Sequence, residues 1–372
     1  MEPFRPTYAE IDLNQLKSNV REIKKEISPN VRLMAIVKAN AYGHGSVEIS
    51  KAAESAGADY FGVASLGEAL ELRSSSIKAP ILILSETPHA HVERVLDAGI
   101  TQTVYTFDLA QLLSDIALQR RSKAKVHVKI DTGMSRVGVL PDKAKALIEK
   151  IAALPGIELE GVFTHFAKAD DTESTFTMEQ FSKFNKIVSS VKAAGIKIPI
   201  LHAANSAAMI NFPQTRLDMV RVGICIYGLK PFENNGNGPK IEPVLSFKTK
   251  VLYIKEVPKN TSVSYGASYY TASDTRIATL PVGYADGLSR GLSNKGSVLI
   301  KGKKYHIAGN VTMDMTMVET GFDKIEVGDE AVLIGTDGSE EITAGDIARL
   351  DGTINYEVVC GIGKRVPRIY RS

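Results

Sequence analysis

Apolar residues follow two patterns along the chain. Between about residues 10 and 230, short β-branched runs alternate with segments whose apolar residues recur every three or four positions. The runs are typical of buried strands and the segments of amphipathic helices, so this part predicts repeated strand–helix units. The expected strands are Leu33–Ala39, Tyr60–Ser65, Ile81–Ser85, Thr101–Thr106, Lys125–Thr132, Leu159–Phe166, Pro199–Ala204 and Met219–Cys225. The expected helices include Leu13–Ile27, Phe107–Arg120, Asp142–Ala153 and Thr177–Ala194.

Eight such units in sequence predict an α/β fold that opens with a (β/α)8 TIM-type barrel. An open doubly wound sheet is the weaker alternative, because periodicity does not distinguish a closed sheet from an open one. The turn-rich stretch Pro231–Lys240 has no apolar face and ends this pattern. We therefore expect a barrel domain over residues 1–235 and a second domain over residues 236–372.

The second domain is expected to be mainly β, with Gly-rich or polar turns between its strands. One short helix is predicted to begin at Thr343, whose hydroxyl can cap it while Asp346 favours the positive end of the helix dipole. The expected strands are Val244–Val257, Thr275–Pro281, Ser297–Ile300, Val311–Glu319 and Asp329–Ile334.

Composition narrows the function to small-molecule chemistry. The 372 residues exceed the size of a single core, and a net charge of +3 with dispersed Lys and Arg gives no footprint for nucleic acid or a membrane surface. No apolar stretch approaches a spanning helix and no secretory leader opens the chain, so we expect a cytoplasmic protein. The only cysteines, Cys225 and Cys360, stand in apolar runs, which predicts buried thiols rather than disulfides or a metal site.

Lys38 is the first candidate for chemistry. It ends the first apolar strand and is followed by a Gly-rich turn, where a barrel places its active site. An amine that loses hydration there can attack a carbonyl cofactor, although a lone strand-end lysine is more often a solvated side chain.

The string Met34-Ala-Ile-Val-Lys-Ala-Asn-Ala-Tyr-Gly-His-Gly resembles the pyridoxal-phosphate attachment motif of alanine racemases, and similarity extends through both domains. The resemblance implies that Lys38 holds pyridoxal 5'-phosphate covalently and that Tyr42 contacts its phosphate. Both residues lie on one exit from a strand, which agrees with a shared ligand.

A phosphate needs backbone donors and hydroxyls, which barrels supply after strands seven and eight. Asn205 and Ser206 follow the seventh expected strand, and Gly223 and Ile224 follow Arg221 in the eighth. The resemblance adds Tyr356 to this phosphate site.

Arg221 is the most informative residue for the reaction type. The resemblance places its guanidinium against the pyridine nitrogen, where many other pyridoxal enzymes use a carboxylate. Arginine hardly releases a proton, so the ring is a poorer electron sink, which suits racemisation better than transamination or decarboxylation. His165 ends the sixth expected strand and is expected to hydrogen-bond Arg221 while staying neutral.

Racemisation needs a second base opposite Lys38. The resemblance assigns this role to Tyr265, which reaches the active site of the other subunit of a homodimer, and it assigns Tyr284 to the narrowed entry. His165 and Arg221 are candidate groups to help the phenol ionise.

The substrate carboxylate calls for a fork of donors, and Arg136 stands at the tip of the loop after the fifth strand. The resemblance adds the backbone of Met313, with Asp314 nearby, and matches Lys129 to a lysine that is carbamylated in several relatives. Thr312 departs from the pattern, because several relatives have cysteine there.

The expected function is therefore racemisation of alanine, which supplies D-alanine for bacterial peptidoglycan. A racemase of broader specificity, for example acting on serine, is the nearest alternative. The second domain of over 130 residues disfavours a non-catalytic pyridoxal-phosphate carrier. Arg221 and the setting of Cys360 disfavour a decarboxylase, and no acid–base loop surrounds either cysteine, which disfavours a cofactor-free racemase.

Overall fold

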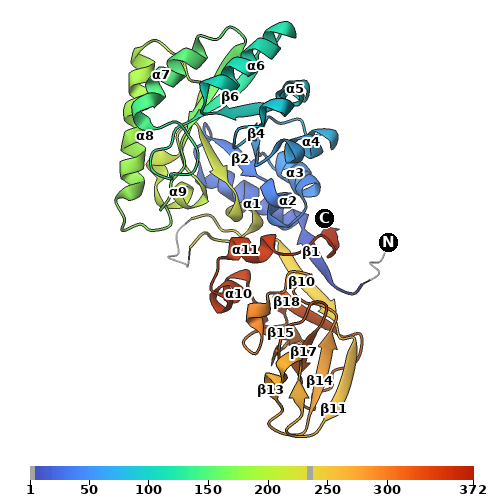
Figure 1. The fold of residues 1–372 in the computed structure, drawn as a ribbon. Helices are drawn as coiled ribbons and strands as arrows, with labels where there is room; N and C mark the ends of the chain where they lie inside the picture. Colours follow the sequence, from blue (N-terminus) through green and yellow to red (C-terminus); the bar gives the residue numbers. More distant parts are fainter. Residues whose placement is uncertain (1–4, 233–237) are drawn as a thin grey trace. The chain divides into compact units, whose positions relative to one another are not determined.

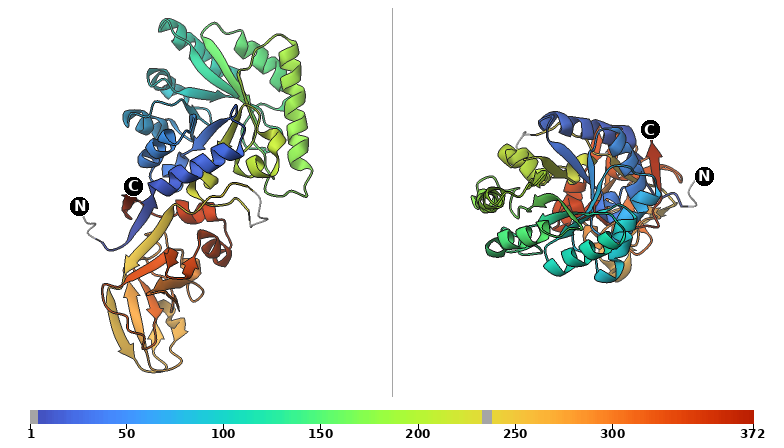
Figure 2. Two further views of the ribbon diagram at one scale, coloured as in Figure 1. Left: turned by 180° about the vertical axis from the view of Figure 1, so that it is seen from behind. Right: turned by 90° about the horizontal axis from the view of Figure 1, so that it is seen from above.

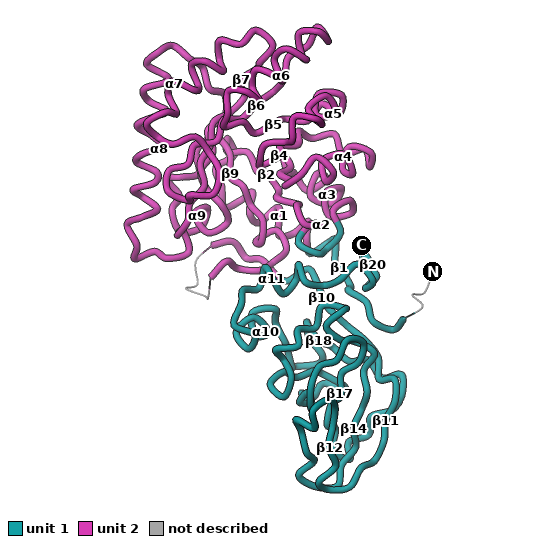
Figure 3. The backbone as a smooth tube through the Cα atoms, in the orientation of Figure 1, with its two compact units in different colours: residues 1–15, 42–45, 243–372 teal, residues 16–41, 46–242 magenta. Residues whose placement is uncertain are grey.

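The protein is described from a computed structural model over residues 5–232 and 238–372. These residues form two compact units, coloured separately in Figure 3. One unit comprises Leu16–Ala41 and Ser46–Glu242, and the other comprises Met1–Gln15, Tyr42–Gly45 and Pro243–Ser372. The expected boundary between residues 235 and 236, within the predicted Pro231–Lys240 linker, lies outside the described residues.

The first unit is a parallel barrel, which confirms the predicted fold class (Figures 1 and 2). Neighbouring strands pair in chain order from β2 to β8, and the last strand, β9, pairs with β2 so that Arg221 lies opposite Met34. Within the described residues β8 and β9 form no strand ladder. The Arg221 N–H also donates to the Ala204 carbonyl at 3.0 Å, beyond the end of β8. The strands are β2 (Arg32–Ile36), β3 (Tyr60–Val63), β4 (Ile81–Ile83), β5 (Thr101–Val104), β6 (Ala124–Lys129), β7 (Ile157–Phe163), β8 (Ile200–His202) and β9 (Met219–Val222).

The first helix of this unit precedes β2, the other helices follow strands, and the helices lie outside the strands (Figure 2). Local sequence explains several of their starts: Ser65 and Glu68 form a capping box before α4, and Pro141 opens α7. Their apolar faces pack together, as Leu113 of α6 and Ile148 of α7 do in one buried cluster. The helices are α1 (Leu13–Glu26), α2 (Lys38–Tyr42), α3 (Ser46–Ser55), α4 (Leu66–Ser74), α5 (Val92–Asp97), α6 (Phe107–Gln119), α7 (Pro141–Ala152), α8 (Phe176–Ala193) and α9 (Ser206–Asn211).

The second unit is mainly β, as expected. Its largest sheet has the order β16–β15–β18–β10–β1–β20, with β19 paired to β18, and smaller sheets have the orders β11–β14–β17 and β12–β13. The strands are β1 (Tyr8–Asp12), β10 (Leu245–Lys250), β11 (Tyr253–Val257), β12 (Ser262–Val263), β13 (Tyr269–Tyr270), β14 (Thr275–Leu280), β15 (Ser297–Ile300), β16 (Lys303–His306), β17 (Thr316–Glu319), β18 (Glu330–Asp337), β19 (Glu340–Ile342) and β20 (Arg368–Arg371).

Two details of this unit differ from the sequence prediction. The single strand expected over Val244–Val257 is two strands in different sheets, because β10 pairs with β1 and β18 whereas β11 pairs with β14. The N-terminal strand β1 joins the same sheet, between β10 and the final strand β20. The strands that pair with β1 and with β10 lie far away in sequence, so local periodicity does not predict these pairings.

The predicted helix start at Thr343 is confirmed, since α10 (Ala344–Asp351) begins there with a capping box between Thr343 and Asp346. A further helix, α11 (Asn355–Cys360), follows it. The expectation that Cys360 is buried was wrong: the only buried residue of α11 is Val359, and Cys360 is exposed. Within the described ranges, every helix is too short or too polar to cross a bilayer.

Candidate active site

Residues predicted from several barrel strands lie at the carboxyl ends of those strands. Lys38 comes two residues after β2, His165 two residues after β7, and Ser206 opens α9 shortly after β8. Arg221 is in β9 itself, and Arg136 stands in the loop after β6. The parallel arrangement therefore brings these side chains to one end of the barrel.

Lys38 opens an unusual turn. The four residues Ala39–Tyr42 all have φ between 52° and 53°, and Ala39 has ψ 51°, so the chain makes a left-handed helical turn. Such a turn is strained for residues with a Cβ. It is held by the Glu68 carboxylate, which accepts from the Ala39 N–H at 2.7 Å, and by the Asn40 side chain, which accepts from the Ser46 N–H at 3.0 Å.

Arg221 is 4% exposed and firmly held. Its Nη2 donates to the carbonyls of Thr164 and Ala203 at 2.8 and 2.9 Å, and its guanidinium lies 5.3 Å from the centre of the Phe163 ring. Burial, with the charge of Arg136, lowers the pKa of Arg221 to about 9. The guanidinium thus stays protonated at neutral pH.

The expected hydrogen bond between His165 and Arg221 is present, with Nη2 and Nδ1 3.1 Å apart. Burial, followed by the charge of Arg221, holds the pKa of His165 well below its usual range, so the ring is neutral. Because a guanidinium can only donate, Nδ1 is the acceptor and the ring proton is on Nε2. His165 is therefore a hydrogen-bond donor on its other side.

Cationic side chains are in excess at this end of the barrel. Arg221, Arg136, Lys129 and Lys38 all act on His165. The one carboxylate among the charges that act on Lys129 is Asp131, whose Oδ1 already accepts from the N–H groups of residues 133, 134 and 135. This donor set fits an anionic ligand that carries several negative groups.

Lys129 is nearly as buried as Arg221. It is 5% exposed, and its ammonium lies 5.5 Å from the centre of the Phe163 ring. Burial, followed by the charges of Arg136 and Arg221, lowers its pKa to about 8. Within the described ranges no carboxylate lies within ion-pair distance of it.

The predicted phosphate loops meet. The Ser206 hydroxyl accepts from the Gly223 N–H at 3.0 Å, which joins the loops after β8 and β9. Ile224 begins a short 3₁₀ helix and is fully buried, and its N–H has no acceptor among residues 5–232 and 238–372. The Asn205 side chain caps α9 by accepting from the Ala208 N–H. A buried amide without an acceptor next to a hydroxyl fits a phosphate group.

The second unit brings together another set of predicted residues. The rings of Tyr42 and Tyr356 have centres 6.0 Å apart. The N–H groups of Tyr284 and Ala285 donate to the carbonyls of Thr312 and Met313, which ties two loops to each other.

Hydrogen bonds between charged side chains connect the loop of Tyr284 and Ala285 to the loop of Thr312 and Met313. Asp286 is fully buried and accepts from Arg5 and Arg365, and Arg365 also donates to the Met313 carbonyl and to Asp314. The two loops are thus joined by ion pairs from Arg5 and Arg365 to Asp286 and from Arg365 to Asp314.

Tyr265 is 77% exposed and begins a 3₁₀ turn, Tyr265–Ala267. Its carbonyl accepts from the Asn310 side-chain amide, and the Asn310 backbone carbonyl accepts from the Ser264 hydroxyl, both at 2.7 Å. Met313 is likewise 52% exposed. The backbone around Tyr265 is therefore fixed, while its phenol points into open space.

Comparison with known proteins identifies the family. Residues 11–231 match the family model "Alanine racemase, N-terminal domain", and residues 244–370 match "Alanine racemase, C-terminal domain". The chain belongs to the alanine racemase family. Members of this family are pyridoxal-phosphate-dependent isomerases, and the recognition made from the sequence is confirmed.

Individual relatives agree over their full lengths. "Alanine racemase 2" of Caldanaerobacter subterraneus is 46% identical over 99% of this chain and 95% of its own length. Alanine racemase of Methanococcus maripaludis is 45% identical over 98% of both. The solved alanine racemase of Clostridium difficile 630 superposes with a TM-score of 0.94 at 41% identity, covering 100% of this chain and 97% of that one.

One solved racemase of this fold is named for another amino acid. "Histidine Racemase from Leuconostoc mesenteroides subsp. sake" has a TM-score of 0.92 at 28% identity, with 100% of this chain and 99% of that chain covered. The alanine racemase family fold therefore does not by itself fix the side chain of the substrate.

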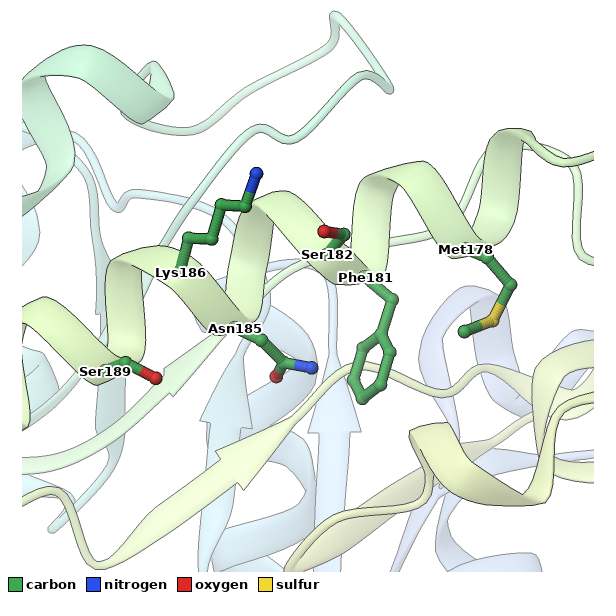
Figure 4. A pocket seen from close by; sticks show the side chains of 6 residues that line it. All are labelled: Met178, Phe181, Ser182, Asn185, Lys186 and Ser189. Carbon is green, nitrogen blue, oxygen red and sulfur yellow. The ribbon is translucent and has the colours of Figure 1, made fainter.

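The two cysteines do not support the alternative of a cofactor-free racemase that uses a pair of thiols. Burial raises the pKa of Cys225 to about 12, so its thiol is protonated at neutral pH. Cys360 is on the exposed face of α11. A hollow of about 580 Å³ on α8, lined by Met178, Phe181, Ser182, Asn185, Lys186 and Ser189, contains none of the predicted site residues (Figure 4).

Sequence reasoning missed the polar groups behind Arg221. His202 and His127 are fully buried in the barrel and Glu160 lies next to them. The available signal was a histidine flanked by β-branched or apolar residues in an expected strand, as in Val126-His127-Val128. Such a buried polar residue requires a partner, but the sequence does not say which one.

Proposed function

We propose that this chain interconverts L-alanine and D-alanine with pyridoxal 5'-phosphate, using Lys38 and Tyr265 as bases on opposite faces of the substrate. The observation that carries the proposal is the group of four cations, Lys38, Lys129, Arg136 and Arg221, at one end of a racemase-type barrel. In bacteria the reaction supplies D-alanine for peptidoglycan.

The cofactor fits the donor set. Lys38 would hold it covalently, Ser206 and the amides at Gly223 and Ile224 would bind its phosphate, and Tyr42 and Tyr356 would add phenolic donors. When bound, pyridoxal phosphate withdraws electrons from the α-carbon of an attached amino acid and acidifies its α-proton.

Arg221 would face the ring nitrogen of the cofactor. Because its guanidinium stays protonated, it donates a hydrogen bond without transferring the proton, which limits how far charge spreads into the ring. Lys38 and Tyr265 would then exchange the α-proton on the two faces, and the Nε2–H of His165 would donate to the phenolate oxygen of Tyr265.

The substrate carboxylate would be bound by Arg136 and the Met313 N–H. The Asp131 carboxylate shapes the loop that carries Arg136, since its Oδ1 accepts from three successive N–H groups. Tyr284 and Asp314 would border the entry.

Lys129 would carry a carbamate. A lysine with a pKa of about 8 has a substantial neutral fraction near neutral pH, and only the neutral amine reacts with carbon dioxide. The product is an anion, so it would offset the positive charges of Arg136 and Arg221 that act on this lysine.

A homodimer with shared sites would explain the exposure of the second-unit residues. Tyr265 and Met313 are large side chains that a single copy leaves mostly open to solvent. A second copy would cover them and would receive the phenol in its own barrel site.

The decisive experiment follows the α-proton in deuterium oxide with Tyr265→Ala, and uses Tyr253→Ala as a control because Tyr253 is a comparably exposed tyrosine on β11. We expect Tyr265→Ala to bind cofactor but to lose exchange from L-alanine, while the control keeps it. Unchanged exchange in Tyr265→Ala would reject the role of the phenol. Lys38→Ala should lose both turnover and the visible absorbance of bound cofactor, and a colourless active enzyme would reject the mechanism.

A broader amino-acid racemase is the second candidate, because a histidine racemase shares this fold. Racemisation of L-alanine and L-serine at equal concentrations would decide between them.

A further inference from the structure

Arg221 is a buried cation without a direct counter-ion. No carboxylate among the described residues lies within ion-pair distance of it, and its Nη1 is 3.1 Å from Nδ1 of His202. A buried charge is costly unless it is paired. A negative charge that is linked to Arg221 through neighbouring side chains is therefore expected along its hydrogen bonds.

The hydrogen bonds continue through the barrel to a carboxylate. His202 Nε2 is 2.8 Å from His127 Nδ1, and His127 Nε2 is 3.0 Å from Glu160 Oε2. Glu160 also accepts from the Tyr60 hydroxyl at 2.7 Å. We name Arg221, His202, His127 and Glu160 the barrel relay.

Every proton of the barrel relay has one consistent position. A guanidinium can only donate, so Nδ1 of His202 accepts and its proton is on Nε2. Nδ1 of His127 then accepts from His202, and Nε2 of His127 donates to Glu160. An ionised carboxylate can only accept, so Arg221 and Glu160 fix the same direction from opposite ends.

The backbone makes room for this arrangement. Between β6 and β7 the register shifts, so that Val126 lies opposite Leu159 and His127 opposite Gly161, which leaves Glu160 as the extra residue of a bulge. Bulges re-aim side chains. A Cβ at Gly161 would come within 2.7 Å of the His127 ring. Phe163 stacks on the His202 ring with centres 4.6 Å apart.

The charges of the barrel relay are those of an ion pair separated by two neutral rings. Burial lowers the pKa of both His127 and His202, so neither ring is charged. Burial raises the pKa of Glu160, but the hydrogen bonds from His127 and Tyr60, with the charge of Lys125, outweigh it and hold the pKa below its usual range. The proton therefore stays on Arg221, whose pKa is about 9.

Other charges lie at both ends of the barrel relay. Lys125 is 3.4 Å from Glu160 Oε1, and Arg32 acts on both His127 and Tyr60. Arg136 acts on Arg221 at the other end. Glu160 is thus the only acidic group bonded to the barrel relay in the described parts of the chain.

We propose that Glu160 is a positioning residue for Arg221, acting through His127 and His202 to hold the guanidinium in one orientation and to supply its counter-charge. This inference rests on the proposed function, in which Arg221 donates to the ring nitrogen of the cofactor. The carboxylate matters because it can only accept hydrogen bonds. The amide of a glutamine in its place could donate to His127 Nε2, and the protons of both imidazoles would then move to their Nδ1 atoms. The Nδ1–H of His202 would point at an N–H of Arg221, so two donors would face each other and that hydrogen bond would be lost.

The test uses the cofactor-loaded full-length enzyme with Glu160→Gln, and Glu158→Gln as the matched control. Glu158 is on the same strand, and its one ion pair with a described residue is with Lys125, at 3.8 Å. Enzyme loaded with cofactor labelled with ¹⁵N in the ring reports the hydrogen bond at that nitrogen by NMR. Turnover and the fraction of cofactor lost to transamination per turnover are measured on the same samples.

We expect Glu160→Gln to shift the ring-nitrogen signal, to lower kcat about tenfold with KM for alanine nearly unchanged, and to raise transamination. Glu158→Gln should match the wild type in all three. His127→Gln breaks the barrel relay at its middle and should give the same changes, which keeps the proposal testable if Glu160→Gln does not fold.

An unchanged ring-nitrogen signal and kcat in a folded Glu160→Gln enzyme would overturn the positioning role. Absence of racemisation by the wild-type protein would instead overturn the proposed function, so the two failures are distinct.

Discussion

The left-handed turn after Lys38 can be tested by glycine substitution at Ala39. This residue is exposed and has φ 53° and ψ 51°. A left-handed conformation costs an L-residue about 1–2 kcal/mol, which glycine does not incur. Glycine loses more backbone entropy on folding, about 0.5–1 kcal/mol relative to alanine. Because the methyl group is exposed, little burial is lost, and Ala39→Gly should stabilise the fold by roughly 0.5–1 kcal/mol.

Ala146→Gly is the matched control, since Ala146 is exposed in the middle of the right-handed helix α7. There glycine should destabilise the fold by about 1 kcal/mol. Equilibrium unfolding in urea at one protein concentration measures both changes. Changes of the same sign in the two variants would refute the left-handed turn. Because the turn carries Lys38, we also expect slower racemisation in Ala39→Gly and unchanged racemisation in Ala146→Gly.

Three further outcomes are expected. In cofactor-free protein kept free of carbon dioxide, so that Lys129 is unmodified, Lys129→Met should raise the free energy of unfolding below pH 8, by about 3 kcal/mol, because the unfolded chain binds the lysine proton more tightly than the folded one. This gain should vanish as the pH rises from 8 to 10.5, and a gain that is constant with pH would contradict the lowered pKa. Gly161→Ala should cost about 1–3 kcal/mol in urea unfolding, since its Cβ meets the His127 ring, and a neutral result would contradict the close approach. Mixing inactive Lys38→Ala and Tyr265→Ala proteins should restore part of the activity after subunit exchange; no recovery despite proven exchange would count against shared sites.

Several site residues could be located from sequence because they follow strands. Lys38, His165 and Ser206 each lie within four residues of the end of a strand, and parallel strands gather such positions at one end of a barrel. The resemblance added the residues of the second unit, such as Tyr265, which no local pattern singles out. The barrel relay escaped both approaches, because a bulge at Glu160 and the space at Gly161 are properties of paired strands.

The sequence alone determined the strand and helix repeats, the helix cap at Thr343 and the positions of the strand ends, since periodicity and capping depend on residues a few places apart. Only the tertiary structure decided that β1 joins β10 and β20, that Val244–Val257 is divided between two sheets, and that Cys360 is exposed. It also decided that Arg221 is linked to Glu160 through two histidines. These features depend on which distant segments pack together. The free energy of that packing comes from contacts between residues far apart in sequence, and the local pattern around one residue does not identify its distant partner.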